Sequence, residues 1–191
     1  MAPGDACTDG QVVTPAQPRR MQPSEAAQIA SVLNRHGVRY VVIGAFAAIA
    51  QRAPIDPTRD IDVTPELARE NLQRLSAALK ELDARIRTDA VEGGLPFDHD
   101  GASLAKAAMW NLVCPLGEFD ISFRPAGFED GYQGLAKRAH RMRIEGVEVP
   151  IADLEDVIRS KEAAGRPKDL RVLPTLYRHL ASLRTEPQDG S

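Results

Sequence analysis

Residues 58–63 have the sequence Thr-Arg-Asp-Ile-Asp-Val, in which acidic and apolar side chains alternate. Alternation with a period of two is typical of a β-strand that is buried on one face only. Ile61 and Val63 would then face the core, and Asp60 and Asp62 would project together from the other face, about 6 to 7 Å apart. Two carboxylates held this close repel each other unless a positive charge binds beside them. The segment therefore predicts a half-buried strand that carries a cation site.

A third carboxylate lies on a second alternating segment. Residues 118–123 have the sequence Glu-Phe-Asp-Ile-Ser-Phe, so Phe119 and Ile121 would face the core and Asp120 the opposite side. Residues 109–114 alternate in a similar way, and the turn residues between the two runs predict a β-hairpin. If this hairpin lies beside the first strand, three carboxylates meet on one surface.

Carboxylate oxygens with open coordination positions suit Mg²⁺. We expect Mg²⁺, as a pair of ions, on Asp60, Asp62 and Asp120, where it also bridges to substrate phosphates and stabilises both ends of an in-line phosphoryl displacement. Asp120 is then also placed to take the proton of an acceptor hydroxyl. An Asp-x-Asp on an exposed strand face is more often solvated surface, so neighbouring segments have to support the metal site.

A small-residue turn precedes the first carboxylates. Residues 40–43 are an apolar run that predicts a buried strand, and Gly44-Ala45 turns it into a helical segment. Free N–H groups at such a helix start bind phosphate, although any tight strand-to-helix turn favours glycine. Arg52 and Arg59 flank the following loop and either neutralise triphosphate oxygens or are ordinary surface arginines.

A lysine occupies a core-facing position in the C-terminal part. Helical spacing puts Leu154, Val157 and Ile158 on one face, and the next position of that series is Lys161. Its stem either passes the helix end to reach solvent, or its ammonium pairs with nucleotide phosphates or with the catalytic carboxylates. Asp169 follows soon after and either caps the last helix or takes part in catalysis.

The remaining segments complete an α/β (α+β) pattern. One amphipathic helix precedes the buried strand, a second begins at Pro65 and includes Leu67, and a strand surrounds Gly146. The C-terminal part is helical over residues 152–164 and 169–183. We therefore expect a mixed β-sheet flanked by helices, with a helical C-terminal part. The expected division is a flexible tail at 1–22, a core domain at 23–150, a C-terminal helical segment at 151–185 and a second flexible tail at 186–191.

The composition is that of an ordinary globular protein. The chain has 191 residues, of which 43% are hydrophobic and 27% charged, and its net charge is -3. One domain with one active site is expected, without an overall attraction to nucleic acid or membranes. Cys7 and Cys114 lie far apart in the sequence, which indicates neither a disulfide framework nor a metal site. The chain has no run of about 18 apolar residues and no secretion signal, so we expect a cytoplasmic protein.

These motifs, taken in order, resemble a known family. The segments are Gly44-Ala45, residues 58–63, residues 119–121 and residues 161–170. They resemble the minimal nucleotidyltransferases of the AbiEii and MenT toxin type and their relatives, over about residues 25–183. The resemblance implies a core similar to that of polymerase beta, with a helical C-terminal part.

The resemblance also implies roles for single residues. Asp60, Asp62 and Asp120 match the metal-binding carboxylates, and Lys161 and Asp169 match the lysine and aspartate of the family's C-terminal motif. These five residues are the expected catalytic set. The expected nucleotide-binding set is Gly44, Ala45, Arg52, Thr58, Arg59 and Arg166. Ala45 replaces the second glycine or serine of the family, so phosphate contact at this turn would rest on backbone N–H groups.

The family transfers a nucleoside monophosphate from an NTP to an acceptor. We expect a Mg²⁺-dependent nucleotidyltransferase that is a toxin of a toxin–antitoxin system and acts on tRNA or protein, with a cognate antitoxin as a further partner and no membrane. A basic run at residues 137–143 could follow an RNA backbone, although such a run is more often a solvated strand edge. Two alternatives remain: a catalytically inactive nucleotide- or partner-binding module of the same fold, and a transferase that modifies a small molecule such as an antibiotic.

Overall fold

Residues 19–185 are described in a computed structural model of the chain. The helices are α1 (Pro23–Arg35), α2 (Gly44–Ala50), α3 (Arg69–Glu81), α4 (Gly101–Leu104), α5 (Tyr132–Ala136), α6 (Leu154–Ala164) and α7 (Pro167–Thr185). The strands are β1 (Tyr40–Ile43), β2 (Asp60–Pro65), β3 (Arg85–Ile86), β4 (Met109–Cys114), β5 (Gly117–Ser122), β6 (His140–Ile144) and β7 (Val147–Ile151).

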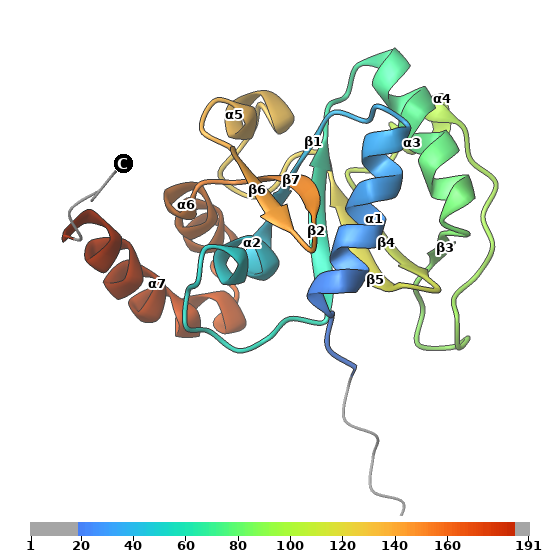
Figure 1. The fold of residues 1–191 in the computed structure, drawn as a ribbon. Coiled ribbons are helices and arrows are strands. Elements are labelled where there is room, and N and C mark those ends of the chain that lie inside the picture. The colour runs from blue at the N-terminus through green and yellow to red at the C-terminus, as the bar shows by residue number, and fades with distance from the viewer. Residues whose placement is uncertain (1–18, 186–191) are drawn as a thin grey trace, which may run out of the picture.

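The strands form one mixed sheet in the order β3-β4-β5-β2-β1-β7-β6. The β2–β5 and β1–β7 pairs are parallel, and the other neighbours are antiparallel. Helices α1 and α3 lie to one side of the sheet, whereas α2, α6 and α7 gather on the other side (Figure 1). The predicted fold class, a mixed sheet flanked by helices with a helical C-terminal part, is confirmed.

The central strands are positioned by their apolar residues. All four residues of β1 are buried, because both faces of this strand are covered. In β2 and β5 burial alternates, with Ile61, Val63, Phe119 and Ile121 in the core. Their period of two leaves the residues in between on the opposite face, where the acidic side chains lie.

The second amphipathic helix begins later than the sequence predicts. Pro65 is the last residue of β2 and pairs with Tyr40, so the helix begins at Arg69, four residues after the predicted start. Leu67, assigned to the apolar face of that helix, is 41% exposed and lies before α3. Cross-strand pairing with β1 outweighs the tendency of a proline to open a helix.

The chain around Gly146 forms a hairpin of two strands, β6 and β7, where the sequence indicates one strand. Glu145 and Gly146 have φ angles of 48° and 83°, which is the positive-φ pair of a type I′ turn. The short elements β3, α4 and α5 were not predicted, because each has five residues or fewer and carries little periodicity.

The last helix begins at Pro167, two residues before the predicted start. Asp169 therefore lies in the first turn of α7 and is not its cap. Pro174 lies inside this helix.

The predicted tails fall almost entirely on residues 1–18 and 186–191, which lie outside the described residues. Met21, assigned to the first tail, is buried, and its backbone N–H donates to the carbonyl oxygen of Thr58 at 2.9 Å. The chain is thus already hydrogen-bonded to the segment before β2, two residues before α1.

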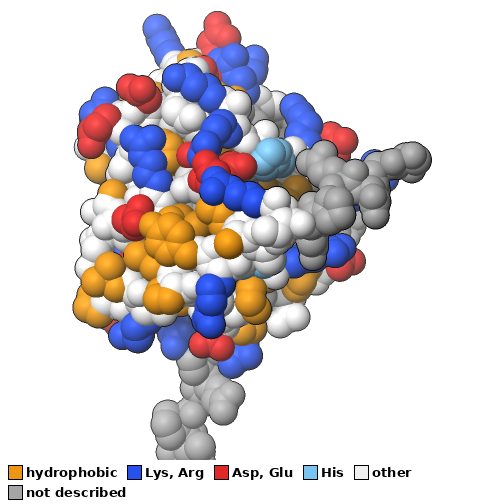
Figure 2. Space-filling view, turned by 90° about the vertical axis from the view of Figure 1, so that its left-hand side faces the viewer, with side chains coloured by type: hydrophobic (Ala, Val, Ile, Leu, Met, Phe, Trp, Pro, Cys, Tyr) orange, Lys and Arg blue, Asp and Glu red, His pale blue; other side chains and the backbone are white. Residues whose placement is uncertain are grey.

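The outer face of α6 and α7 carries an apolar groove. Figure 2 looks onto this side of the molecule and shows hydrophobic side chains gathered between charged ones. The groove measures about 440 Å³ and its apolar residues are Ile158, Tyr177, Leu180 and Ala181. Between residues 19 and 185, no helix has the length and apolar character needed to cross a membrane.

Candidate active site

The three predicted carboxylates meet on one face of the sheet. In the parallel pairing of β2 with β5, Asp62 lies opposite Asp120 and Asp60 opposite Glu118. Register and alternation together put all four acidic side chains on the face that the core residues leave free. We call Asp60, Asp62, Glu118 and Asp120 the carboxylate cluster. Glu118 was not predicted, although its position two residues before Asp120 puts it on the same face.

The crowding of negative charge is most pronounced at Asp62. The pKa of the Asp62 carboxyl is raised to about 7, chiefly by burial and then by the nearby charges of Asp60 and Asp120, against the opposing charges of Lys161 and Lys168. Positive charge bound beside this side chain would favour its ionised form. The two lysines are near enough to act on Asp62, which connects the C-terminal helices to the cluster.

Arg87 contacts the cluster and was not predicted. Its Nη1 donates to Glu118 Oε2 at 2.8 Å and its Nη2 donates to Asp120 Oδ1 at 2.8 Å. The same Nη1 lies 3.9 Å from Asp60 Oδ2. Burial raises the pKa of Asp120, and the Arg87 charge opposes that rise. Arg87 directly follows β3, a two-residue strand that no periodicity reveals.

The cluster fits a divalent cation by the chemistry of its donors. Hard carboxylate oxygens are the protein ligands of Mg²⁺, and a bound cation would favour the ionised form of Asp62, which burial and the neighbouring carboxylates disfavour. Within residues 19–185, however, no three His, Cys, Asp or Glu side chains are arranged to hold a metal ion. The Arg87 guanidinium is hydrogen-bonded to two of the four acidic groups in this arrangement.

Position 44 requires a glycine because the Asp62 side chain leaves no room for a Cβ there. Its φ is 78°, and β1 pairs Ile43 directly with Asp62. A Cβ at position 44 would lie 2.8 Å from Asp62 Cγ and closer still to Oδ2. A glycine at the start of α2 therefore leaves space for the Asp62 carboxylate. The phosphate role predicted for Gly44 and Ala45 stays a prediction.

The C-terminal motif forms an ion-pair group around the buried Asp169. Lys161 Nζ donates to Asp169 Oδ1 at 3.0 Å, and Arg166 Nε donates to Asp169 Oδ2 at 2.5 Å. The Asp169 side chain is 2% exposed and that of Lys161 11%, so the lysine takes the core-facing position that its helical spacing predicts. Burial works to raise the pKa of Asp169, but the hydrogen bonds from Lys161 and Arg166 outweigh it and hold that pKa below its usual value.

The other predicted nucleotide-binding residues are dispersed. Thr58 Oγ1 donates to Asp60 Oδ1 at 2.8 Å and so holds one carboxylate of the cluster. Arg52 is exposed just after α2, with a φ of 65°. No hydrogen bond or ion pair within residues 19–185 joins Arg52 or Ala45 to the cluster.

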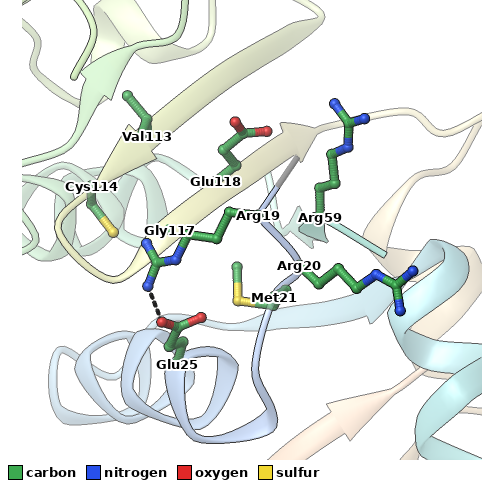
Figure 3. Close-up of a pocket in the computed structure, with 9 residues that line it drawn as sticks. All are labelled: Arg19, Arg20, Met21, Glu25, Arg59, Val113, Cys114, Gly117 and Glu118. Atoms are coloured by element: carbon green, nitrogen blue, oxygen red, sulfur yellow. Dashed lines mark hydrogen bonds and ion pairs between the residues drawn. The ribbon is translucent and has the colours of Figure 1, made fainter. Parts of the chain in front are cut away.

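A pocket lies beside the cluster. Its volume is about 200 Å³, and it opens between the segment before α1 and the β4–β5 turn (Figure 3). Glu118 lines the pocket and also belongs to the cluster, so the two sites share a wall. The residues that line it are Arg19, Arg20, Met21, Glu25, Arg59, Val113, Cys114, Gly117 and Glu118.

Solved structures of similar fold have this architecture. Lincomycin-bound LnuA, a lincosamide antibiotic adenylyltransferase, is 14% identical with a TM-score of 0.55, over 83% of this chain and 98% of its own. ANT(2″)-Ia in complex with adenylyl-2″-tobramycin is 16% identical with a TM-score of 0.54, over 85% of this chain and 91% of its own. The fold is that of the nucleotidyltransferases.

A third protein of nucleotidyltransferase fold agrees with the other two. It is an antigenic nucleotidyltransferase-like protein from Paracoccidioides brasiliensis, 18% identical with a TM-score of 0.51, over 91% of this chain and 92% of its own. No protein-family model and no curated protein matches the sequence. At these identities the likeness concerns the nucleotidyltransferase fold alone.

Proposed function

We propose that the protein is a Mg²⁺-dependent nucleotidyltransferase that moves a nucleoside monophosphate from an NTP to an acceptor. The observation that carries the proposal is the β2–β5 register, which sets Asp62 opposite Asp120 with Asp60 on the same face. On a nucleotidyltransferase fold, three carboxylates this close together are the expected binding site for a cation that also binds triphosphate.

The residues in and around the cluster would have different roles. Asp60, Asp62 and Asp120 would hold Mg²⁺, which when bound neutralises the charge that develops on the transferred phosphoryl group. Thr58 fixes the orientation of Asp60 through its hydroxyl. Burial raises the pKa of Asp120, which makes this carboxylate a better acceptor for the proton of an attacking hydroxyl.

The C-terminal motif supplies positive charge. Lys161 and Lys168 act electrostatically on Asp62, so both lie where triphosphate oxygens bound at the cluster would be stabilised. Asp169 is almost fully buried and orients Lys161 and Arg166 through its two oxygens. We assign Asp169 a positioning role rather than contact with the substrate.

The acceptor we propose is tRNA, with the protein acting as the toxin of a toxin–antitoxin pair. The pocket beside the cluster supports a phosphate-bearing acceptor, because three arginines line it; Arg19 pairs with Glu25, which leaves the positive charges of Arg20 and Arg59. No carboxylate within residues 19–185 forms an ion pair with Arg20 or Arg59. A guanidinium without a carboxylate partner favours phosphate and disfavours a polycationic acceptor.

A small-molecule acceptor is the second candidate. LnuA with lincomycin and ANT(2″)-Ia with adenylyl-2″-tobramycin share the fold, which supports an antibiotic as acceptor. The arginines of the pocket argue against an aminoglycoside, whose amino groups are cationic, and argue less against a lincosamide.

Label transfer tests the proposal. The protein is incubated with Mg²⁺ and each NTP in turn, labelled at the α-phosphate, together with total tRNA, cell protein, a lincosamide or an aminoglycoside. We expect label on tRNA, lost with Asp60→Ala and kept with Asp56→Ala, an exposed aspartate of the preceding loop. Label on a drug alone supports the second candidate, and no label with any NTP and acceptor supports an inactive binding module.

A further inference from the structure

Arg87 reaches across the sheet from its edge. Its backbone N–H donates to the carbonyl oxygen of Asn111 at 2.9 Å, which fixes the chain against β4. Asn111 pairs with Asp120 on the next strand. The Arg87 guanidinium therefore crosses β4 and binds carboxylates of β5, with Asp60 of β2 also within 3.9 Å of it.

The contact is more than an exposed ion pair. The side chains of Arg87 and Asp120 are 26% and 14% exposed, so water screens them only in part. The planar guanidinium uses separate nitrogens for Glu118 and Asp120, a geometry that an ammonium cannot reproduce. Arg87 neutralises charge at the cluster that would otherwise repel across two strands.

The Asp120 carboxylate is shared between Arg87 and the proposed cation. Asp120 Oδ1 accepts the hydrogen bond from Arg87, and Asp120 belongs to the set that would hold Mg²⁺. A cation that draws this carboxylate into its coordination shell weakens or breaks the Arg87 hydrogen bond. Glu118 lies beside the arginine pocket and keeps its own contact with Arg87.

We propose that Arg87 is an internal counter-cation of the carboxylate cluster, which a divalent cation displaces from Asp120 towards Glu118. This inference rests on the proposed function, because it requires the cluster to bind a cation. Arg87 is a positioning residue: it holds Asp120 in place while the cluster lacks a cation. Coupling between two sites is reciprocal. If a bound cation weakens the contact between Arg87 and Asp120, that contact lowers the affinity for the cation to the same extent.

Binding of Mn²⁺, measured by calorimetry on the full chain without NTP, tests the inference. We expect Arg87→Met to bind Mn²⁺ about tenfold more tightly than the unchanged protein, as typical coupling between sites allows. Arg87→Lys keeps the charge but loses the two-pronged contact, so its affinity should fall between the two. Arg85→Met is the matched control, since Arg85 pairs with Asp83 and not with the cluster, and it should leave the affinity unchanged.

Stability provides a readout that is independent of cation binding. In chelator, Arg87→Met should unfold at a lower urea concentration than Arg85→Met, because the cluster is left without its counter-charge. Added Mn²⁺ should raise its midpoint by more than it raises that of the unchanged protein. If Arg87→Met does not fold, Arg87→Lys carries the same comparison.

The outcomes separate the inference from the proposed function. The role of Arg87 is overturned if Arg87→Met and Arg87→Lys bind Mn²⁺ no more tightly than the unchanged protein, while Asp60→Asn removes the binding. In that case the metal site itself is still supported. Absence of any Mn²⁺ binding sensitive to Asp60→Asn overturns both.

Discussion

Replacement of Gly44 by alanine probes the contact between the turn after β1 and the carboxylate cluster. Gly146 is the matched control: its φ is 83° against 78° for Gly44, but a Cβ there would meet no atom within 4 Å. Each change places an L-residue in the left-handed region, at a cost of about 1 to 2 kcal/mol. At Gly44 the new methyl group also overlaps Asp62 and forces it aside, which adds about 1 to 3 kcal/mol as overpacking does.

Urea denaturation of both variants gives the difference directly. We expect Gly44→Ala to lose about 1 to 3 kcal/mol more than Gly146→Ala, and displacement of Asp62 to lower nucleotidyl transfer by about 100-fold, as a misplacement of about 1 Å does. Gly146→Ala should transfer at the normal rate. Equal stability losses together with equal transfer rates would refute the contact between position 44 and Asp62 as the reason for the glycine.

Three further predictions follow from the charged groups. Asp62→Asn, in chelator, should be more stable than the unchanged protein by up to about 4 kcal/mol above about pH 7, and the gain should vanish near about pH 4. The cost of ionising Asp62 in the folded protein builds up between its unfolded and folded pKa values and remains in full above them. A gain that persists undiminished at about pH 4 would contradict this. Mn²⁺ affinity should rise between about pH 6 and 8, since the cation competes with the proton on Asp62, and a calorimetric titration showing no change over that range would count against a proton there. Lys161→Met should cost about 2 to 4 kcal/mol in urea denaturation because Asp169 loses a buried partner, against less than about 0.5 kcal/mol for Arg141→Met at an exposed pair; equal losses would show that Lys161 and Asp169 are not coupled.

The acidic cluster was predictable because its cause is local. A period of two in residues 60–63 and 118–123 fixes which face each side chain takes, and only the neighbourhood of the two strands needed the structure. The same alternation contained Glu118, whose position on that face follows from Asp120 two residues later. Lys161 was predictable for the same kind of reason, because helical spacing fixes its side.

Other features depend on contacts between distant segments. Arg87 follows a two-residue strand, and its role arises only when β4 and β5 bring Glu118 and Asp120 within reach. The late start of α3 has a similar origin, since pairing with β1 extends β2 to Pro65. Neither sequence pattern nor local propensity contains this information.

The central claim is that the carboxylate cluster binds a triphosphate through a divalent cation. Calorimetric titration with a non-hydrolysable NTP analogue, in Mg²⁺ and then in chelator, tests it most directly. Saturable binding in Mg²⁺ that disappears in chelator and in both Asp60→Asn and Asp120→Asn is the predicted result. Binding of equal strength in chelator, or unchanged in these two variants, would contradict it.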